Sequence, residues 1–331
     1  MARYRESLPQ LSDDLYLMDG GIETDLIFNH GIKIREFASH TLLADAAGRQ
    51  AVVSYFRGYL ALACELGTGF ILNSQTWKAH MHWAGDLGAS EEELKAANQD
   101  SVDLIVGLRG EARMNTRPIV LNGVIGPRSD GYGSNAVIAA HEAEEYHSRQ
   151  LAWLAETDVD MVTATTFTQS AEAAGVVRAA RKVGLPVVVS FTVETDGWLP
   201  SGQPLCEAID AVDRASDSGA AYFLLNCAHP DHFAHVLEDA RWARRIRGIR
   251  PNASQRTHAE LNDSDTLDAG NPDELGRQCR AIYEKMPWLN IFGGCCGTDL
   301  RHVAEIGGAL AGLTRFSGSG SSRASRRSGQ E

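Results

Sequence analysis

Three of the six cysteines stand where their sulfurs could act together on one metal ion. Cys227 follows the apolar run 221–225 after a single asparagine. The adjacent pair Cys295 and Cys296 follows a second apolar run and has glycines on both sides. If both runs are strands of one parallel barrel, three thiolates meet at its mouth. Three thiolates suit a thiophilic metal, above all Zn²⁺, with the fourth coordination position left open for a substrate.

The adjacent cysteines are the most specific part of this pattern. Neighbouring side chains of a strand point to opposite faces, so two adjacent cysteines do not both fit one core. The flanking glycines allow the backbone to bend until Cys295 and Cys296 face one ion. A redox-active dithiol and an incidental pair remain open as alternatives. Cys64, Cys206 and Cys279 fall on apolar helical stripes instead, and we expect them to be buried structural residues.

The elements that must position these sulfurs alternate between apolar runs and amphipathic segments. Such alternation predicts a parallel α/β sheet or barrel. Eight runs are predicted to be strands, and eight strands close a (β/α)8 TIM barrel in a single domain. The runs are Leu15–Met18, Gly69–Leu72, Pro118–Leu121, Asp160–Ala164, Pro186–Phe191, Ala221–Leu225, Ile246–Ile249 and Leu289–Phe292. The seventh is the weakest prediction, because it is rich in arginine.

Helices are predicted between these strands. Apolar residues recur with the helical period from Val52 to Cys64 and again from Leu275 to Met286. The segment 90–93 has the sequence pattern of a capping box, which opens a further helix. We therefore predict that residues 1–314 form the barrel. Residues 317–331 are only Ser, Gly and Arg apart from one Ala, one Gln and one Glu, and we predict that residues 315–331 form a disordered tail.

Chemistry in a TIM barrel lies at the C-terminal ends of its strands. The residues directly after each apolar run are therefore candidates for a functional site. Besides the three cysteines, these candidates are Asp19, Gly20, Gln75, Trp77, Thr165, Glu194, Asn226 and Asn252. The ring face of Trp77 could attract a cationic group.

Charge and composition bound the class of protein. The formal net charge of −12 argues against nucleic acid or an anionic membrane surface as the main partner. No apolar stretch approaches the ~20 residues that a membrane span needs, and residues 1–14 have no signal-peptide core. We expect a cytoplasmic protein that acts on small molecules. Whether it is a monomer or a homo-oligomer is left undetermined by the sequence.

Four segments together resemble the homocysteine S-methyltransferase family, with similarity from about residue 15 to residue 313. These segments are Asp19-Gly20-Gly21 with Thr24 and Leu26, Asn226-Cys227, Pro251-Asn252-Ala253, and Gly293-Gly294-Cys295-Cys296-Gly297-Thr298. The resemblance implies a (β/α)8 barrel in which Cys227, Cys295 and Cys296 hold Zn²⁺. It also implies transfer of a methyl group to the sulfur of a thiol, and it assigns to Asp19 the contact with the amino group of homocysteine.

The chain departs from the family pattern after the fourth run. The family has a glutamate there, a second carboxylate for the substrate ammonium, where this chain has Thr165. A hydroxyl cannot supply the same ionic contact. Glu194, after the fifth run, could replace the missing charge. A thiol without an α-amino group is therefore an alternative acceptor.

These observations predict a zinc-dependent S-methyltransferase. A metal-bound thiol is deprotonated, so a substrate sulfur at the open position would be nucleophilic. The methyl donor would be a sulfonium or ammonium compound, and homocysteine is the first candidate acceptor, which would give methionine. The expected catalytic residues are Asp19, Thr165 and Asn226; the expected substrate-binding residues are Asp19, Gly20, Gln75, Trp77, Thr165, Glu194 and Asn252. The alternatives are a different thiol acceptor, or a zinc- and thiol-binding protein on the same barrel without donor chemistry.

Overall fold

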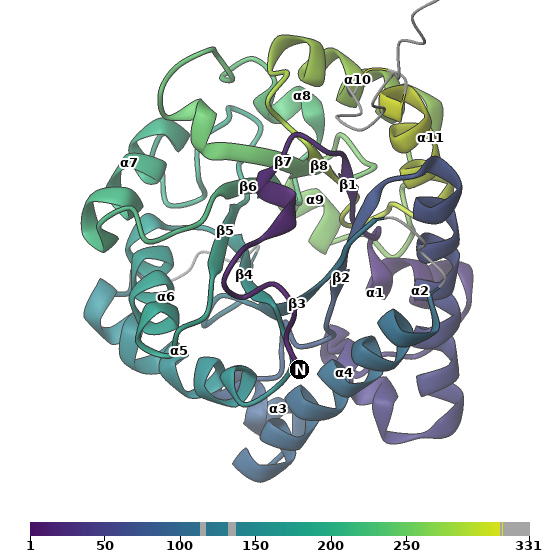
Figure 1. Cartoon of the computed structure of the whole chain (residues 1–331), viewed down its shortest axis with the longest axis vertical. Coiled ribbons are helices and arrows are strands. Elements are labelled where there is room, and N and C mark those ends of the chain that lie inside the picture. Colours follow the sequence, from purple (N-terminus) through teal and green to yellow (C-terminus); the bar gives the residue numbers. More distant parts are fainter. Residues whose placement is uncertain (113–116, 132–136, 312, 314–331) are drawn as a thin grey trace, which may run out of the picture.

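The computed structural model describes residues 1–112, 117–131, 137–311 and 313 of the chain. Eight parallel strands close a barrel in which each strand pairs with its neighbours in chain order, and β8 pairs with β1. The strands are β1 Tyr16–Leu17, β2 Gly69–Asn73, β3 Ile119–Ile125, β4 Met161–Phe167, β5 Val187–Phe191, β6 Phe223–Asn226, β7 Ile246–Arg250 and β8 Ile291–Phe292. The predicted (β/α)8 barrel is therefore confirmed, and each of the eight apolar runs overlaps one strand (Figure 1). The predicted tail, residues 315–331, lies outside the described residues.

The strands are apolar on both faces because each lies between two layers of core. One buried cluster fills the barrel interior and includes Tyr16, Ile71 and Leu224. A second, larger cluster lies between the strands and the surrounding helices, and it includes Phe70 and Phe223. Side chains of successive strand residues point to opposite faces, so Phe70 and Ile71 belong to different clusters. A side-chain-filled interior of this kind leaves the barrel ends as the places for a ligand.

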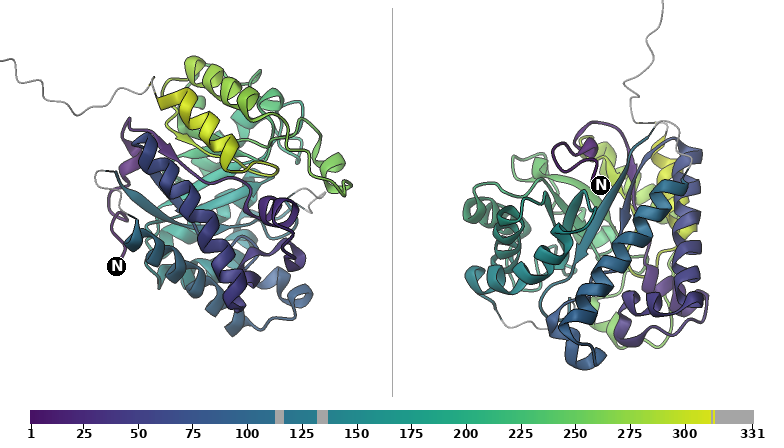
Figure 2. Two further views of the ribbon diagram at one scale, coloured as in Figure 1. Left: turned by 90° about the vertical axis from the view of Figure 1, so that its right-hand side faces the viewer. Right: turned by 60° about the horizontal axis from the view of Figure 1, so that its bottom comes forward.

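Helices surround the barrel. They are α1 Ile22–Thr24, α2 Ala46–Leu66, α3 Ala84–Leu87, α4 Glu91–Glu111, α5 Ala140–Ala155, α6 Ser170–Lys182, α7 Leu205–Ser216, α8 Pro230–Phe233, α9 His258–Asn262, α10 Pro272–Lys285 and α11 Leu300–Ala311. Short 3-10 or π segments are η1 Pro9–Leu11, η2 Asp25–Asn29, η3 Arg35–Phe37, η4 Ser39–Ala44, η5 Met81–Trp83 and η6 Ala243–Arg245. The last helix, α11, packs against α2 and so closes the ring (Figure 2).

The helical predictions are largely confirmed. Ser90 and Glu93 form the predicted capping box at the start of α4. Cys279 is buried on α10, as its apolar stripe predicted. Cys64 on α2 is exposed and Cys206 on α7 is only partly buried, so the prediction that all three lone cysteines are core residues was wrong. The buried stripe of α2 includes Val52, Phe56, Tyr59 and Ala63, and Cys64 follows the last of these on the solvent side of the helix.

The N-terminal segment covers one end of the barrel. In Figure 1 it crosses the barrel opening that faces the viewer. Backbone N–H groups of Arg3 and Tyr4 donate to Asp160 Oδ1, at 2.6 and 2.9 Å. Arg109 Nη1 pairs with Asp160 Oδ2 at 2.9 Å, and both side chains are buried. This end is therefore filled by the chain itself, and the opposite end carries the C-terminal ends of the strands.

One structural finding concerns membranes. Within the described ranges of the chain, no helix is both long enough and apolar enough to cross a bilayer.

Candidate metal and thiol site

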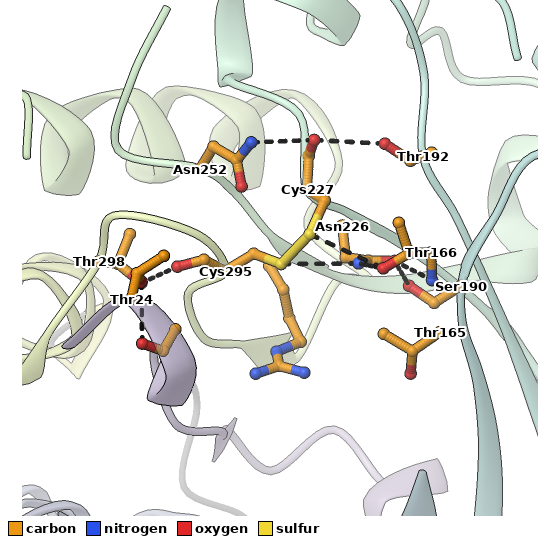
Figure 3. Close-up of a disulfide and its surroundings, with 12 residues drawn as sticks. Thr24, Thr165, Thr166, Ser190, Thr192, Asn226, Cys227, Asn252, Cys295 and Thr298 are labelled. Carbon is orange, nitrogen blue, oxygen red and sulfur yellow. Dashed lines mark hydrogen bonds between the residues drawn. A yellow bond between two sulfur atoms is a disulfide. The ribbon is translucent and has the colours of Figure 1, made fainter. Parts of the chain in front are cut away.

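The three cysteines singled out in the sequence meet at the C-terminal end of the barrel. Cys227 directly follows β6, and Cys295 and Cys296 follow β8. Their three Sγ atoms all lie within 4.8 Å of one another. In this structure Cys227 and Cys295 form a disulfide, across 68 residues of sequence (Figure 3). The adjacent cysteines are thus not bonded to each other, and the sulfur partner of Cys295 comes from a different strand.

The donor set fits Zn²⁺. Tetrahedral zinc with Zn–S bonds near 2.3 Å needs sulfur ligands roughly 3.8 Å apart. Three sulfurs within 4.8 Å of one another meet that need with small side-chain rotations, once the disulfide is reduced. Cys227 is buried, and Cys296 is partly buried and lines a cavity. A metal held here would have three protein ligands and an open side facing that cavity, which is the pattern of a catalytic zinc rather than a structural one.

The backbone at Cys227 is held in a conformation that residues other than glycine rarely adopt. Its φ is +55°, in the left-handed region. Three side chains fix this geometry by donating to the Cys227 carbonyl oxygen: Asn252 Nδ2 at 3.0 Å, His258 Nε2 at 2.7 Å and Thr192 Oγ1 at 3.2 Å. Strained backbone persists where surrounding contacts impose it, and it is frequent at functional sites.

A polar network lies beneath the sulfurs. Asn226 Nδ2 donates to Thr166 Oγ1 at 2.7 Å, and Thr166 Oγ1 lies 3.7 Å from Cys227 Sγ. Asn226 Nδ2 also lies 3.7 Å from Cys295 Sγ (Figure 3). Ser190 Oγ donates to the Asn226 amide oxygen. Once the disulfide is reduced, these amide and hydroxyl donors would orient the sulfurs of Cys227 and Cys295.

Close backbone approach explains the glycines around the site. The amide of Gly21, after β1, donates to the Thr298 carbonyl oxygen at 3.0 Å. A Cβ on Gly20 would lie 2.8 Å from that same oxygen, and a Cβ on Gly294 would overlap the Thr298 side chain. The amide of Gly297 donates to Thr24 Oγ1 at 3.0 Å. The loops after β1 and β8 therefore pack closely against each other, and this packing sets the position of the adjacent cysteines.

A cavity of about 480 Å³ opens above the sulfurs. Eight of the residues predicted for the site line it: Asp19, Gly20, Gln75, Trp77, Thr165, Cys227, Cys295 and Cys296. The other three do not line it. Instead, Asn226 Nδ2 lies 3.7 Å from Cys295 Sγ and Asn252 Nδ2 donates to the Cys227 carbonyl oxygen. Glu194 is partly exposed, and its Oε1 lies 3.3 Å from His258 Nδ1.

Asp19 is buried at the end of β1 and already has several partners. Its Oδ1 accepts from Asn73 Nδ2 at 2.6 Å and pairs with Arg250 Nη2 at 3.1 Å. Its Oδ2 accepts from Tyr55 Oη at 3.3 Å. Burial raises the pKa of Asp19 above its ordinary value, and the charge of Arg250 and the bond from Asn73 oppose that rise. The carboxylate therefore depends on Arg250 to remain charged.

Several charged residues of the cavity wall were not among the predicted site residues, and Arg250 and Glu23 are two of them. Arg250 ends β7, the strand that its arginines made the weakest prediction. Glu23, on α1, accepts a hydrogen bond from Ser39 Oγ at 2.6 Å, and burial raises the pKa of the Glu23 carboxyl above its ordinary value. The position of Arg250 directly after an apolar run was the signal that could have identified it. Nothing in the local sequence distinguishes Glu23 from a surface helix residue.

Trp77 and Thr165 lie together on one wall. Trp77 Nε1 donates to the Thr165 carbonyl oxygen at 3.0 Å, which fixes the indole edge. The Thr165 hydroxyl donates to the Thr163 carbonyl oxygen at 3.4 Å, its one side-chain hydrogen bond within the described part of the chain. Gln75 is anchored by its Nε2, which donates to the Asn73 carbonyl oxygen at 2.9 Å. This wall is therefore aromatic and neutral rather than acidic.

Comparison with known proteins bears on what the site does. A profile of the homocysteine S-methyltransferase family matches residues 16–310. The chain belongs to the homocysteine S-methyltransferase family. That family consists of methyltransferase enzymes, so the resemblance seen in the sequence is confirmed.

Curated relatives match only in part. Methionine synthase of Mycobacterium tuberculosis (strain ATCC 25618 / H37Rv) is 30% identical over 136 residues, which are 40% of this chain and 11% of that protein. Methionine synthase of Mycobacterium leprae (strain TN) is 30% identical over 132 residues, which are 38% of this chain and 10% of that protein. The match thus spans about a tenth of the length of these relatives.

Solved structures of the family share the fold. The oxidised form of the homocysteine methyltransferase MmuM from Escherichia coli has a TM-score of 0.65 and 18% identity, covering 89% of this chain and 95% of that chain. The metallated form of the same enzyme has a TM-score of 0.64 and 16% identity, covering 89% and 96%. At this level of identity the likeness is one of barrel architecture.

Proposed function

We propose that this member of the family is a zinc-dependent S-methyltransferase that transfers a methyl group from a sulfonium or ammonium donor to a thiol. The observation that carries the proposal is the meeting of Cys227, Cys295 and Cys296 at the cavity floor, within 4.8 Å of one another. Bound Zn²⁺ would supply Lewis acidity that keeps a substrate thiol ionised at neutral pH. The three cysteines would be its protein ligands.

The chain's own residues account for the rest of the chemistry. The network of Asn226 and Thr166 orients the cysteine sulfurs. In the transfer, a bond forms between the acceptor sulfur and the methyl carbon while the bond from that carbon to the donor sulfur or nitrogen breaks. The donor leaves as a neutral thioether or amine, and the thiol proton passes to solvent. No covalent enzyme intermediate is needed, so positioning of the two substrates supplies much of the rate.

A cationic donor suits the cavity. Trp77 lines one wall, and aromatic faces attract sulfonium and ammonium groups. The acidic residues Glu23, Glu36, Asp130 and Asp268 also line the cavity. Their negative charge favours entry of a cation and departure of the neutral product.

Homocysteine is the acceptor that family membership and the names of the relatives favour. One observation favours a second class of acceptor. Asp19, which the resemblance assigns to the substrate ammonium, is instead paired with Arg250. A thiol that lacks the ammonium is therefore the second candidate, and the corresponding reaction is otherwise the same.

The protein would act as a single barrel domain over residues 1–314 in the cytoplasm, where a reducing environment keeps cysteine thiols available to a metal. A matrix of donors and acceptors tests the function. Reduced, zinc-loaded protein is incubated with S-methylmethionine, adenosylmethionine, betaine or a dimethylsulfonium compound and with a series of thiols. Mass spectrometry of the S-methylated thiol is the readout. Stoichiometric zinc without transfer for any pair would favour a binding protein over an enzyme.

A further inference from the structure

Arg250 is a cation at the floor of the cavity, next to the cysteines. It ends β7, where its Cα is in register with Asn226 of β6. Its carbonyl oxygen accepts from the amide of Cys227 at 3.1 Å, so the two residues are joined through the backbone. Its side chain is 9% exposed and lines the cavity. A buried arginine beside a metal-binding cluster requires an anionic partner.

Within the described residues, only one nitrogen of the Arg250 guanidinium donates hydrogen bonds to the protein. All of the hydrogen bonds that the described residues give it run from Nη2: to Asp19 Oδ1 at 3.1 Å, and to the carbonyl oxygens of Asp19 and Gly20 at 3.4 Å. Nε is buried without a partner in the same part of the chain. A guanidinium carries five N–H donors in a planar fork that matches a carboxylate. The arginine therefore retains the capacity to bind an anion.

The Asp19 carboxylate is already paired with Arg250 and is not free to bind a substrate cation. Its two oxygens accept from Asn73, Tyr55 and Arg250. A substrate ammonium in contact with this carboxylate would also lie next to the Arg250 guanidinium. The two positive charges would repel each other. Thr165, on β4, also lines the cavity and offers no charge to compensate. The polar end of an acceptor thus meets a cation where the family pattern has two carboxylates.

We infer that Arg250 binds the carboxylate of the thiol acceptor and that Asp19 is a positioning residue for Arg250, not a ligand for an ammonium. The inference rests on the proposed function and names the acceptor class: a short mercaptocarboxylate whose sulfur reaches the cysteines. Because Arg250 and Cys227 are neighbours across β6 and β7, the carboxylate and the sulfur of one small molecule can engage both. Carboxylate recognition is then the requirement for turnover, and the α-amino group is dispensable.

Four thiols that differ by one group each provide the test. Homocysteine carries an ammonium and a carboxylate, 4-mercaptobutyrate only the carboxylate, 3-mercaptopropylamine only the ammonium, and 1-propanethiol neither. Each is assayed with a donor found in the matrix above. We expect both carboxylates to exceed both other thiols in kcat/KM, by roughly 10- to 100-fold for a charged hydrogen-bonded pair. Faster transfer to 3-mercaptopropylamine than to 4-mercaptobutyrate would overturn the inference.

Variants separate the two residues. Arg250→Gln should lower kcat/KM for the two carboxylates and leave the other two thiols within about threefold. Arg250→Lys, which keeps the charge but loses the fork, should restore part of the preference. Asp19→Asn should lower kcat/KM for homocysteine and for 4-mercaptobutyrate by the same factor. A loss with homocysteine alone would show that Asp19 binds the ammonium, and it would refute the assignment.

A binding measurement without turnover distinguishes failure of this inference from failure of the proposed function. Calorimetry compares 4-(methylthio)butyrate with 3-(methylthio)propylamine, the products of two of these thiols. Wild-type protein should bind the carboxylate more tightly, and Arg250→Gln should abolish the difference. Arg280→Gln, at an exposed position on α10, is the matched control. This variant should retain the wild-type difference in affinity between the two ligands. Absence of transfer for every pair would refute the function, whereas transfer that ignores Arg250 would refute only the inference.

Discussion

Asn226 and Thr166 are hydrogen-bonded to each other in both directions. Asn226 Nδ2 donates to Thr166 Oγ1 at 2.7 Å, and the Thr166 amide donates to Asn226 Oδ1 at 3.1 Å. Asn226 is the last residue of β6 and Thr166 lies in β4, so the pair joins strands that are not neighbours in the barrel. Thr166, like Cys227, has a positive φ, of 64°. The reciprocal bonds therefore hold strained backbone beneath the sulfurs.

Removal of this pair should weaken metal binding without unfolding the barrel. Asn226→Ala deletes the donor shared by Thr166 Oγ1 and Cys295 Sγ. Loss of a group that supports metal ligands typically lowers metal affinity about 10- to 100-fold. Competition with a chromogenic chelator measures that change. The exposed Asn29→Ala, outside the cavity wall, should leave the affinity as it is; equal affinities in both variants would contradict a supporting role.

Two glycines should respond to alanine with opposite sign. A Cβ on Gly294 would overlap the Thr298 side chain, whose Oγ1 is held by the Cys295 carbonyl oxygen. Gly294→Ala should lower the free energy of unfolding by about 1–3 kcal/mol and displace the adjacent cysteines. Gly308, exposed on α11, has no atom within 4 Å of such a Cβ. Gly308→Ala should raise the free energy of unfolding by up to about 1 kcal/mol. Denaturant titration measures both, and losses of equal size would contradict the packing described here.

Stability should fall in mild acid because of a buried histidine. Burial lowers the pKa of His40 to about 4, and its Nδ1 has no hydrogen-bond partner among the described residues. The unfolded chain binds a proton at this site below about pH 6.5, but the folded chain does so only below about pH 4. Above about pH 6.5, His40 has no effect on how the free energy of unfolding depends on pH. Between about pH 6.5 and pH 4, that free energy should fall by roughly 3 kcal/mol in all.

His40→Gln tests that assignment. The free energy of unfolding is measured by denaturant titration from pH 7 to pH 4. The variant should show a shallower decline than the wild type, even if it is less stable at pH 7. Burial also lowers the pKa of His80, so part of the decline should remain. Identical slopes for the two proteins would exclude His40 as a source of the acid sensitivity.

The barrel fold and the meeting of the three cysteines could both be predicted from the sequence, for physical reasons. A buried parallel strand is a continuous apolar run, so eight such runs identified β1 to β8. Strand ends converge in a barrel, which brought Cys227 to Cys295 and Cys296. Arg250 was missed because its charge counted against a strand, whereas its partner Asp19 lies 231 residues away and could not be paired with it from local pattern.

Supporting residues were also difficult to recognise. His258 opens α9, far along the chain from Cys227, yet its Nε2 lies 2.7 Å from the Cys227 carbonyl oxygen. Contacts of this kind depend on loop geometry rather than on periodicity. Asn226 and Asn252 were predicted as site residues from their positions after strands. In the structure they contact Cys295 and Cys227 and do not line the cavity.

Thiol accessibility should depend on metal. In this structure Cys295 is bonded to Cys227 and not to Cys296, so a dithiol function of the adjacent pair would require a different sulfur pairing. Under the zinc proposal, reduced protein should show fewer thiols reactive with a disulfide reagent before chelation than after it, by three per chain. Equal counts before and after chelation would favour a redox role for these cysteines.

Zinc content is the most direct test of the central claim. Wild-type protein, Cys296→Ala and the exposed-cysteine control Cys64→Ala are purified under reducing conditions, and zinc per chain is measured by mass spectrometry of the metal. Wild type and Cys64→Ala should each hold one zinc ion per chain, and Cys296→Ala should hold almost none and transfer no methyl group. Stoichiometric zinc in Cys296→Ala, or full activity of metal-free wild type, would contradict the account.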